Sequence, residues 1–270
     1  MKALKTFLLS LFLILSMSGM SWLFIGSSTA TFDPTSIASV KAWWRSDSLT
    51  ISGSDILTLV DKSGNSNTLT FQSGRRPTLS AGAGPMGRDR MVFCGSCGGN
   101  FGSSNLVTQT SGLTFAMVWQ SANPVVNNPM VTNLRTENSL RDFRFQLVPA
   151  VAGYSYLTLS LVGASTINVG YNGYGSQITN LHTLIIQYVG SNPDTAGSWT
   201  VTVDGTDRSV ITDANALGSP FNVNSIGTPN PGTAGYDPAG YHYDISIYNA
   251  VLSGPEKAGL LSYYASYYGL

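Results

Sequence analysis

Carboxylic acids that could carry out hydrolytic chemistry are scarce in this sequence. Glycoside hydrolysis commonly uses two carboxyl groups that flank the bond to be cleaved. The 270 residues contain only two glutamates, Glu137 in the polar segment NLRTENSLRD and Glu256, which follows Ser253 at helix-capping spacing. A carboxylate pair would have to come mainly from aspartates in turns, such as Asp61 and Asp204, and solvated carboxylates serve poorly as the acid. We therefore expect no catalytic residues and no buried carboxylate pair facing a sheet concavity.

The two histidines are the other candidates for proton transfer. Lyase chemistry on a uronate would need Arg, Asn or Gln, His and Tyr to converge on a concave face. His182 begins the apolar segment LHTLIIQYV, and a histidine at a strand edge, bonded to backbone, explains it without catalysis. His242 shares a strand face with Asp244, Ser246 and Tyr248. Such a polar row more often faces solvent than a substrate, so neither histidine is assigned a catalytic role.

The segment DKSGNSN groups oxygen-bearing side chains on a tight turn. Asp61 and Asn65, with Ser63 and Asn67 beside them, could supply hard oxygen ligands to calcium. The segment lacks the glycine and the distal glutamate of an EF-hand at the required positions. Asp and Asn side chains that hydrogen-bond their own backbone explain the same residues without a metal. Both interpretations stay open, and no other cofactor is expected.

The only cysteines, Cys94 and Cys97, lie in MVFCGSCGG. No second cysteine pair or nearby histidine completes a zinc site. A redox-active pair would need a helix N-terminus to stabilise the thiolate, and the glycine-rich context offers none. In an oxidising compartment we expect a small disulfide loop, with Cα atoms less than ~7 Å apart. A reduced pair is the alternative.

Short runs of alternating apolar and polar residues predict half-buried strands. Such runs occupy 143–147, 157–161 and 199–203, and the last leads into Asp204-Gly205, a dipeptide typical of a tight hairpin. Segments that are apolar on both faces predict central strands covered on two sides, at 113–120 and 181–189. Two such layers make a sandwich.

One helix is predicted, near the C-terminus. Ser253 and Glu256 form a capping box, Pro255 lies in the first turn, and Gly269 can end the helix. The apolar face that would pack on the sandwich consists of Leu260, Tyr263, Tyr264 and Tyr267.

Residues 1–30 have the pattern of an export signal. Lys2 and Lys5 precede an uncharged run at 7–26, and Ser28 and Ala30 occupy the small-residue cleavage positions. The run is also close to the ~20 residues that span a bilayer, so an uncleaved signal anchor is the alternative. In either case residues 31–270 are expected as one domain outside the cytoplasm, touching the membrane only through an uncleaved N-terminal segment.

The charge balance argues against a nucleic-acid partner. The formal net charge is zero, and without residues 1–30 the chain keeps 12 basic and 14 acidic residues, a net charge of −2. No basic run is present that could neutralise a row of phosphates.

Three segments together resemble the laminin G-like (LamG) jelly-roll domains of the concanavalin A-like lectin/glucanase superfamily, of bacterial and phage type. Residues 39–79 are similar to the opening strand, the D-x-S-G-N-x-N turn and a following Arg-Pro. Residues 181–190 and 199–207 resemble a central strand and the V-D-G hairpin, and 241–270 resemble the closing strand and terminal helix. The resemblance implies an all-β, two-sheet antiparallel jelly roll, preceded here by a hydrophobic leader helix. It also implies that the strand near residue 40 pairs with YHYDISIYN. Some relatives bind calcium, which is why a calcium site at the DKSGNSN turn is considered.

The resemblance and the scarcity of acids together favour a non-catalytic recognition module over an enzyme. The module would be secreted or displayed on a cell or virion surface, and would bind carbohydrate or a cell-surface partner. Tyr171, Asn172 and Tyr174, in GYNGYGSQ, could stack on a sugar ring and bond its hydroxyls, although a glycine-rich turn explains them equally. The alternative is a structural or decoration protein of a phage particle or bacterial surface. A glycan-active hydrolase or lyase is the third hypothesis.

Overall fold

The computed structural model describes residues 32–94, 97, 99–100, 106–108, 112–120, 130–135, 142–149, 155–161, 165–170, 180–189, 198–212, 222–223, 225–226 and 239–270. The predicted leader at residues 1–30 lies outside these ranges. Inside them, no helix combines the length and the apolar character needed to cross a membrane.

Strands dominate the described residues. They are β1 (Val40–Arg45), β2 (Leu49–Ser52), β3 (Asp55–Leu59), β4 (Leu69–Phe71), β5 (Thr78–Ser80), β6 (Arg90–Cys94), β7 (Gly99–Asn100), β8 (Val107–Thr108), β9 (Leu113–Gln120), β10 (Met130–Arg135), β11 (Asp142–Pro149), β12 (Ser155–Leu161), β13 (Ser165–Gly170), β14 (Leu181–Tyr188), β15 (Trp199–Val203), β16 (Thr206–Thr212), β17 (Asn222–Val223), β18 (Ser225–Ile226) and β19 (Ala239–Tyr248). Helices are the 3-10 turns η1 (Pro34–Ser36) and η2 (Pro85–Gly87) and the α-helix α2 (Gly254–Tyr268).

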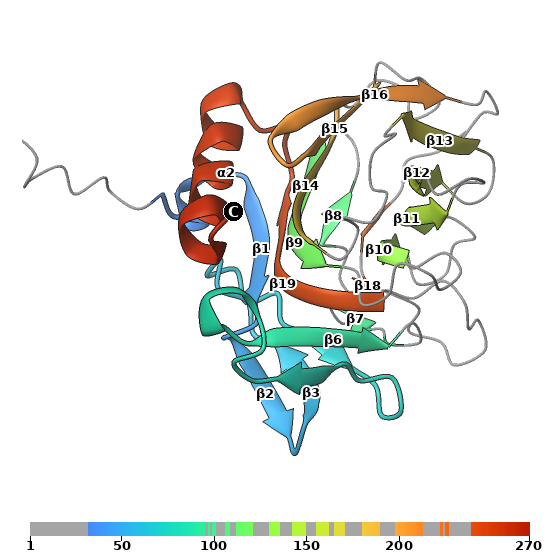
Figure 1. Cartoon of the computed structure of the whole chain (residues 1–270). Helices are drawn as coiled ribbons and strands as arrows, with labels where there is room; N and C mark the ends of the chain where they lie inside the picture. Colours follow the sequence, from blue (N-terminus) through green and yellow to red (C-terminus); the bar gives the residue numbers. More distant parts are fainter. Residues whose placement is uncertain are drawn as a thin grey trace, which may run out of the picture. The chain divides into compact units, whose positions relative to one another are not determined.

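The strands form a β-sandwich in which all described pairings are antiparallel. One layer, called here the central sheet, contains β1, β19, β9, β14 and β15, each paired with the next. β16 pairs with β15 and also with β13, and so leads into the second layer, β13, β12, β11 and β10. Figure 1 shows this second layer facing the central sheet on the side opposite α2. The predicted antiparallel β-sandwich with a C-terminal helix is confirmed.

The first and last strands lie side by side, as predicted. β1 pairs with β19 from Val40 opposite Tyr248 to Arg45 opposite Asp244. The central strands are also confirmed, because β9 and β14 pair along their whole length and are buried almost throughout. At the predicted hairpin, Asp204 and Gly205 have φ angles of 50° and 73° between β15 and β16. Both lie in the left-handed region that this type of tight turn requires.

An irregularity in β19 divides that strand into two halves. Its first half pairs with β6 and its second half with β1 (Figure 1). The register against β9 shifts between His242 and Asp244, which marks a β-bulge. A bulge adds one residue to one strand, so side chains on its two sides lose the simple alternation of an unbroken strand.

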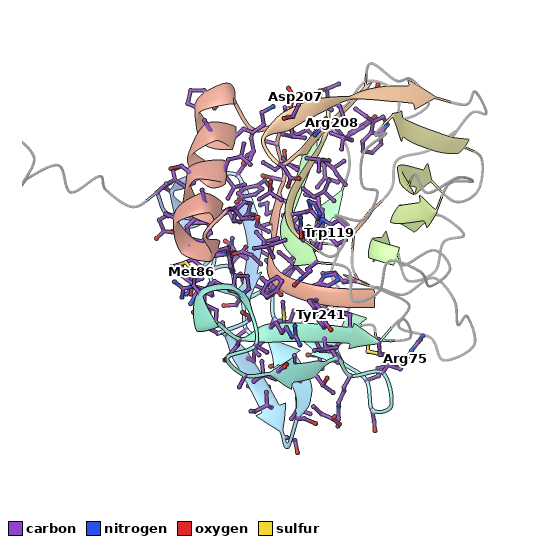
Figure 2. All side chains as sticks on the ribbon, in the orientation of Figure 1. Arg75, Met86, Trp119, Asp207, Arg208 and Tyr241 are labelled. Atoms are coloured by element: carbon purple, nitrogen blue, oxygen red, sulfur yellow. A yellow bond between two sulfur atoms is a disulfide. The ribbon has the colours of Figure 1, made fainter. Side chains whose placement is uncertain are left out.

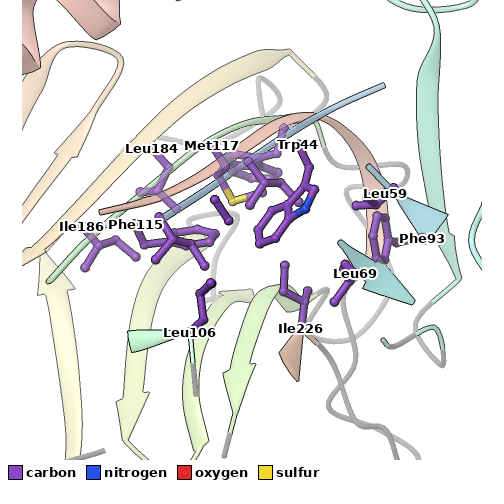
Figure 3. Packing of buried hydrophobic residues seen from close by; sticks show 14 of the residues in the cluster. Trp44, Leu59, Leu69, Phe93, Leu106, Phe115, Met117, Leu184, Ile186 and Ile226 are labelled. Atoms are coloured by element: carbon purple, nitrogen blue, oxygen red, sulfur yellow. The ribbon is translucent and has the colours of Figure 1, made fainter. Parts of the chain in front are cut away.

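The inner face of the central sheet is packed with large apolar side chains. Trp44, Phe115, Met117, Leu184 and Ile245 are each at most 1% exposed and belong to one cluster. Figure 3 shows the cluster continuing to Leu59, Leu69 and Phe93 from β3, β4 and β6. Burial of this apolar area is the main stabilising contribution to the fold.

Helix α2 covers the outer face of the central sheet (Figure 1). The predicted capping box is present: the Ser253 hydroxyl accepts the Glu256 N–H, and the Glu256 carboxylate accepts the Ser253 N–H at 2.8 Å. Gly269 ends the helix with φ of 74°. The buried face consists of Leu260, Tyr263, Tyr264 and Tyr268. The predicted fourth member, Tyr267, lies instead at the edge of that face and is only partly buried.

Candidate functional site

The turn at Asp61 is held by a dense set of hydrogen bonds. Its carboxylate accepts the backbone N–H groups of Trp43, Ser63 and Asn67 and the Ser63 hydroxyl, all at 2.8–2.9 Å. The Asn65 side-chain amide donates to the β1 backbone at 2.9 Å. The structure thus brings Asp61 and Asn65 into one turn that anchors β1. In the described part of the chain, no three His, Cys, Asp or Glu side chains gather as a metal site would require. Calcium binding at this turn stays a prediction.

The residues predicted to contact sugar, Tyr171, Asn172 and Tyr174, lie outside the described residues, as does Glu137. Cys94 and Cys97 are described, and a disulfide joins them with Cα atoms 5.4 Å apart. This separation is within the range that a disulfide requires.

His182 lies near the start of β14, where it is opposite Trp119 of β9, and it is buried. Its Nδ1 is 2.8 Å from Oδ2 of Asp204, and its ring lies 5.5 Å from the ring of Trp119 on β9 (labelled in Figure 2). The other Asp204 oxygen accepts the N–H of Thr183 at 2.9 Å. The predicted position at the end of a strand agrees with the place of His182 near the start of β14, and its predicted backbone bond stays a prediction. One partner of the imidazole is a carboxylate carried by the hairpin turn.

A pocket of about 290 Å³ adjoins Asp204. Leu181, Leu261 and Ala265 give it an apolar wall between the central sheet and α2, and among the described residues Asp204 is the one charged side chain that lines it. The two members of the pair differ in access to solvent, since the Asp204 side chain is 39% exposed and that of His182 only 7%. A ligand in the pocket can reach the carboxylate, whose Oδ2 is in contact with the imidazole of His182. A carboxylate in this position can accept hydroxyl groups or exchange a proton.

The predicted solvent-facing row on β19 is wrong in two respects. His242, Asp244, Ser246 and Tyr248 are all fully buried. They also do not share one environment, because the bulge separates His242 from the other three. The His242 ring lies 4.5 Å from Phe93 in the inner cluster, whereas Asp244 lies under α2.

Asp244 is the fully buried carboxylate between the central sheet and α2. Its Oδ1 accepts the indole N–H of Trp43 at 3.0 Å. Its Oδ2 accepts two phenol hydroxyls of α2, Tyr263 at 3.1 Å and Tyr268 at 3.2 Å. Burial raises the pKa of Asp244 to about 7, and the three donors offset only part of that effect. This carboxyl therefore changes charge near neutral pH inside the structure.

The hydrogen-bond network of Asp244 continues outward to a charged surface. Arg45 donates to the Tyr263 hydroxyl at 3.1 Å and pairs through two nitrogens with Asp47. Burial raises the pKa of Asp47, but the hydrogen bonds and charge of Arg45 and the charge of Lys62 outweigh it and lower that pKa. The outer end of the network is thus an ion-pair cluster at the edge of α2.

Sequence reasoning placed Asp244 in a solvent-facing row and so missed its contact with the tyrosines of α2. The signal that could have found this contact is the density of tyrosine in α2, with four tyrosines at 263, 264, 267 and 268. A helix that buries several tyrosines needs acceptors for their hydroxyls. The facing strand offers Asp244 as the acceptor.

No protein-family model matches the sequence, and no curated protein matches it. Solved structures do match. Domain 4 of AbnA, a GH43 extracellular arabinanase from Geobacillus stearothermophilus, determined in complex with arabinotriose, has a TM-score of 0.51 at 14% identity, over 83% of this chain and 98% of that chain. A GH54 α-L-arabinofuranosidase soaked with a cyclic sulfate inhibitor has a TM-score of 0.52 at 14% identity, over 79% of this chain and 51% of that chain. Trypanosoma rangeli sialidase, with 2,3-difluorosialic acid as a covalent intermediate, has a TM-score of 0.51 at 11% identity, over 83% of this chain and 33% of that chain.

This chain thus corresponds to nearly all of the arabinanase domain, to about half of the arabinofuranosidase and to about a third of the sialidase. The likeness shows a β-sandwich of the kind that glycoside hydrolases contain. The interpretation as a non-catalytic recognition module, with a phage or surface decoration protein as its alternative, is corrected by these neighbours, which are carbohydrate-active enzymes or a domain of one. They give no support to a virion or adhesion role. A carbohydrate partner and a secreted location are both compatible with them.

Proposed function

We propose that this protein is glycan-active: it takes a saccharide onto the β-sandwich and takes part in processing it. The observation that carries the proposal is the likeness to the arabinanase domain, because almost the whole of that domain aligns and its structure holds arabinotriose. We further propose that residues 31–270 are one exported domain, and that the sandwich is a jelly roll of the concanavalin A-like, LamG type.

The pocket beside Asp204 is the place in the described structure with the chemistry for this role. Sugar hydroxyls are hydrogen-bond donors, and a carboxylate that is 39% exposed can accept them. The hydrogen bond from His182 at 2.8 Å orients the carboxylate and supplies a second group able to hold a proton. Leu181 and Leu261 offer apolar contact for the carbon face of a sugar ring.

Asp204→Asn is the variant that tests the site with little structural disturbance. Asparagine tolerates the positive φ of this position, and its side-chain oxygen can still accept the Thr183 N–H. Asp207→Asn is a matched control, because Asp207 lies on the same hairpin but pairs with Lys257 at 2.8 Å.

The experiment is to incubate the full chain with arabino-oligosaccharides, arabinoxylan and uronate-containing oligosaccharides. Binding is measured by calorimetry and bond cleavage by release of reducing ends. We expect at least one of these glycans to be bound or cleaved, and Asp204→Asn to lower affinity or kcat/KM by about tenfold or more. Asp207→Asn should stay close to the wild type. The proposal fails if the folded protein neither binds nor cleaves any of them.

A further inference from the structure

Positively charged side chains gather near Tyr267 of α2, where the helix contacts Arg45 of β1. We call this surface the arginine–tyrosine patch, composed of Arg45, Asp47, Lys62, Arg88 and Tyr267. The Arg88 guanidinium carbon lies 3.3 Å from the centre of the Tyr267 ring, and that of Arg45 lies 4.3 Å from it. The Tyr267 hydroxyl donates to Asp47 at 3.2 Å. Two guanidinium groups and one carboxylate thus contact Tyr267, and Lys62 lies 3.8 Å from that carboxylate.

The charge of Asp47 is already balanced by Arg45 within the patch. Both Asp47 oxygens pair with Arg45, whereas Lys62 approaches the same carboxylate only to 3.8 Å. Among the described residues, Arg88 makes no ion pair, and the carboxylate next to it in sequence, Asp89, accepts the N–H of Gly82 at 2.9 Å. The patch therefore keeps a net charge of two positive units, although the whole chain has none.

Arg88 is also held in a fixed orientation. Its Nε donates to the backbone carbonyl of Tyr267 at 2.8 Å, and its guanidinium carbon lies over the ring of the same residue. Its two terminal nitrogens make no hydrogen bond to any described residue. A guanidinium whose two terminal nitrogens stay available binds a planar carboxylate in two-point fashion, and little conformational entropy is lost because the group is already ordered.

We infer that the arginine–tyrosine patch binds the carboxylate of an acidic saccharide, of the uronic-acid class, with Arg88 as the main contact and Lys62 as a second cation. The inference rests on the proposed glycan-active function and specifies the class of sugar. A uronate adds hydroxyl groups beside its carboxylate, and the partly exposed Asp47 side chain, at 41%, can accept them. A neutral sugar has no charge that the positive patch could attract.

The test compares a matched pair of ligands on the full chain. Calorimetry at low salt is run with an oligogalacturonate and with its methyl ester, which differs only by loss of the charge, and arabinotriose is the neutral reference. We expect the acid to bind about tenfold or more tightly than the ester, with a difference that shrinks as salt is raised. Arg88→Gln should remove most of that preference.

Two further variants keep the result interpretable. Lys62→Gln changes a side chain that is 29% exposed and should reduce the preference by a smaller factor, even if Arg88→Gln does not fold. Arg76→Gln is the control, because it removes one cation from a different surface, where Arg76 lies 3.9 Å from Asp55. Equal binding of acid and ester, with arabinotriose bound, overturns the patch but leaves the glycan-active function standing. An equal loss of the preference for the acid in Arg76→Gln also overturns the proposed role of the patch. Tighter binding of a sulfated ligand than of the carboxylate would contradict the assignment to uronic acids. Binding of none of the glycans rejects the proposed function itself.

Discussion

The two faces of the central sheet are both buried, yet different interactions hold them. The inner face packs aliphatic and aromatic side chains into one cluster with residues of β3, β4 and β6, and hydrophobic burial dominates there. The outer face packs against α2 through a carboxylate, an indole N–H and phenol hydroxyls. Burial on the inner face depends on shape and apolar area. On the outer face it depends on each polar group finding a partner.

Two adjacent tryptophans on β1 show this difference between the two faces of the central sheet. Trp44 points inward, is fully buried in the apolar cluster and donates its indole N–H to the backbone of Asn67 at 2.9 Å. Trp43 points outward and donates to Asp244 at 3.0 Å. The same side-chain type therefore serves packing on one face and electrostatics on the other.

The largest expected effect on stability comes from truncating a large side chain on the inner face. Trp44→Ala removes a fully buried indole and should lower the free energy of unfolding by about 3–5 kcal/mol. Chemical denaturation measures the change. Ile51→Ala is the control, because Ile51 is 49% exposed and its truncation should change stability by no more than about 0.5 kcal/mol. Similar losses in both variants would show that the inner cluster is not the main core.

The outer face should differ by responding to pH. In the unfolded chain the Asp244 carboxyl ionises near its ordinary pKa of 3.8, and in the folded chain burial raises the pKa to about 7. Between these values the folded state binds more protons than the unfolded state, so stability falls as pH rises. The loss from Asp244 alone amounts to about 4 kcal/mol at about 1.4 kcal/mol per pKa unit.

Asp244→Asn should remove that pH dependence. From pH 4 to pH 8 the wild type should lose the stability that depends on Asp244, whereas the variant should not, because asparagine does not ionise. The variant should therefore become more stable relative to the wild type as pH rises. Denaturation series across this range measure it. Asp55→Asn, which alters a carboxylate with 48% exposure, should show no such trend. A constant difference between Asp244→Asn and the wild type would contradict a raised pKa at this position.

Local patterns predicted those parts of the fold that local sequence controls. The strands at 113–120 and 181–188, the Asp204-Gly205 hairpin and the capping box of Ser253 and Glu256 each depend on a few neighbouring residues. Pairing of the first and last strands came from the family resemblance and is also confirmed.

The site residues could not be predicted in the same way, because their partners are distant in sequence. The bond between His182 and Asp204 joins residues 22 positions apart and depends on how β14 and β15 align. Asp244 and Trp43 are 201 positions apart. The bulge in β19 also breaks the alternation on which the predicted polar row was based. Only tertiary packing decides whether such a row faces solvent or a helix.

The paired tryptophans offer a sharper version of the same comparison. Trp43→Phe removes one of the three donors to Asp244, and so should cost about 1–2 kcal/mol more at pH 8, where the carboxylate is charged, than at pH 5. Trp44→Phe removes a bond to a neutral carbonyl, so its cost should not change with pH. Denaturation at the two pH values distinguishes them. A pH-dependent cost for Trp44→Phe, or none for Trp43→Phe, would break the assignment of the two faces.

The smallest expected effect concerns how α2 is held on the outer face. The Ser253 hydroxyl accepts the N–H of Glu256 in the first turn, where helical N–H groups otherwise lack partners. Ser253→Ala should therefore lower stability by about 1 kcal/mol, whereas Ser262→Ala, an exposed position within the same helix, should have almost no effect. Because the cap bears no relation to the charge of Asp244, the loss should be the same at pH 5 and pH 8. A loss that grew with pH would mean that the start of the helix and the buried carboxylate are coupled, and that the outer face responds to protonation as one unit.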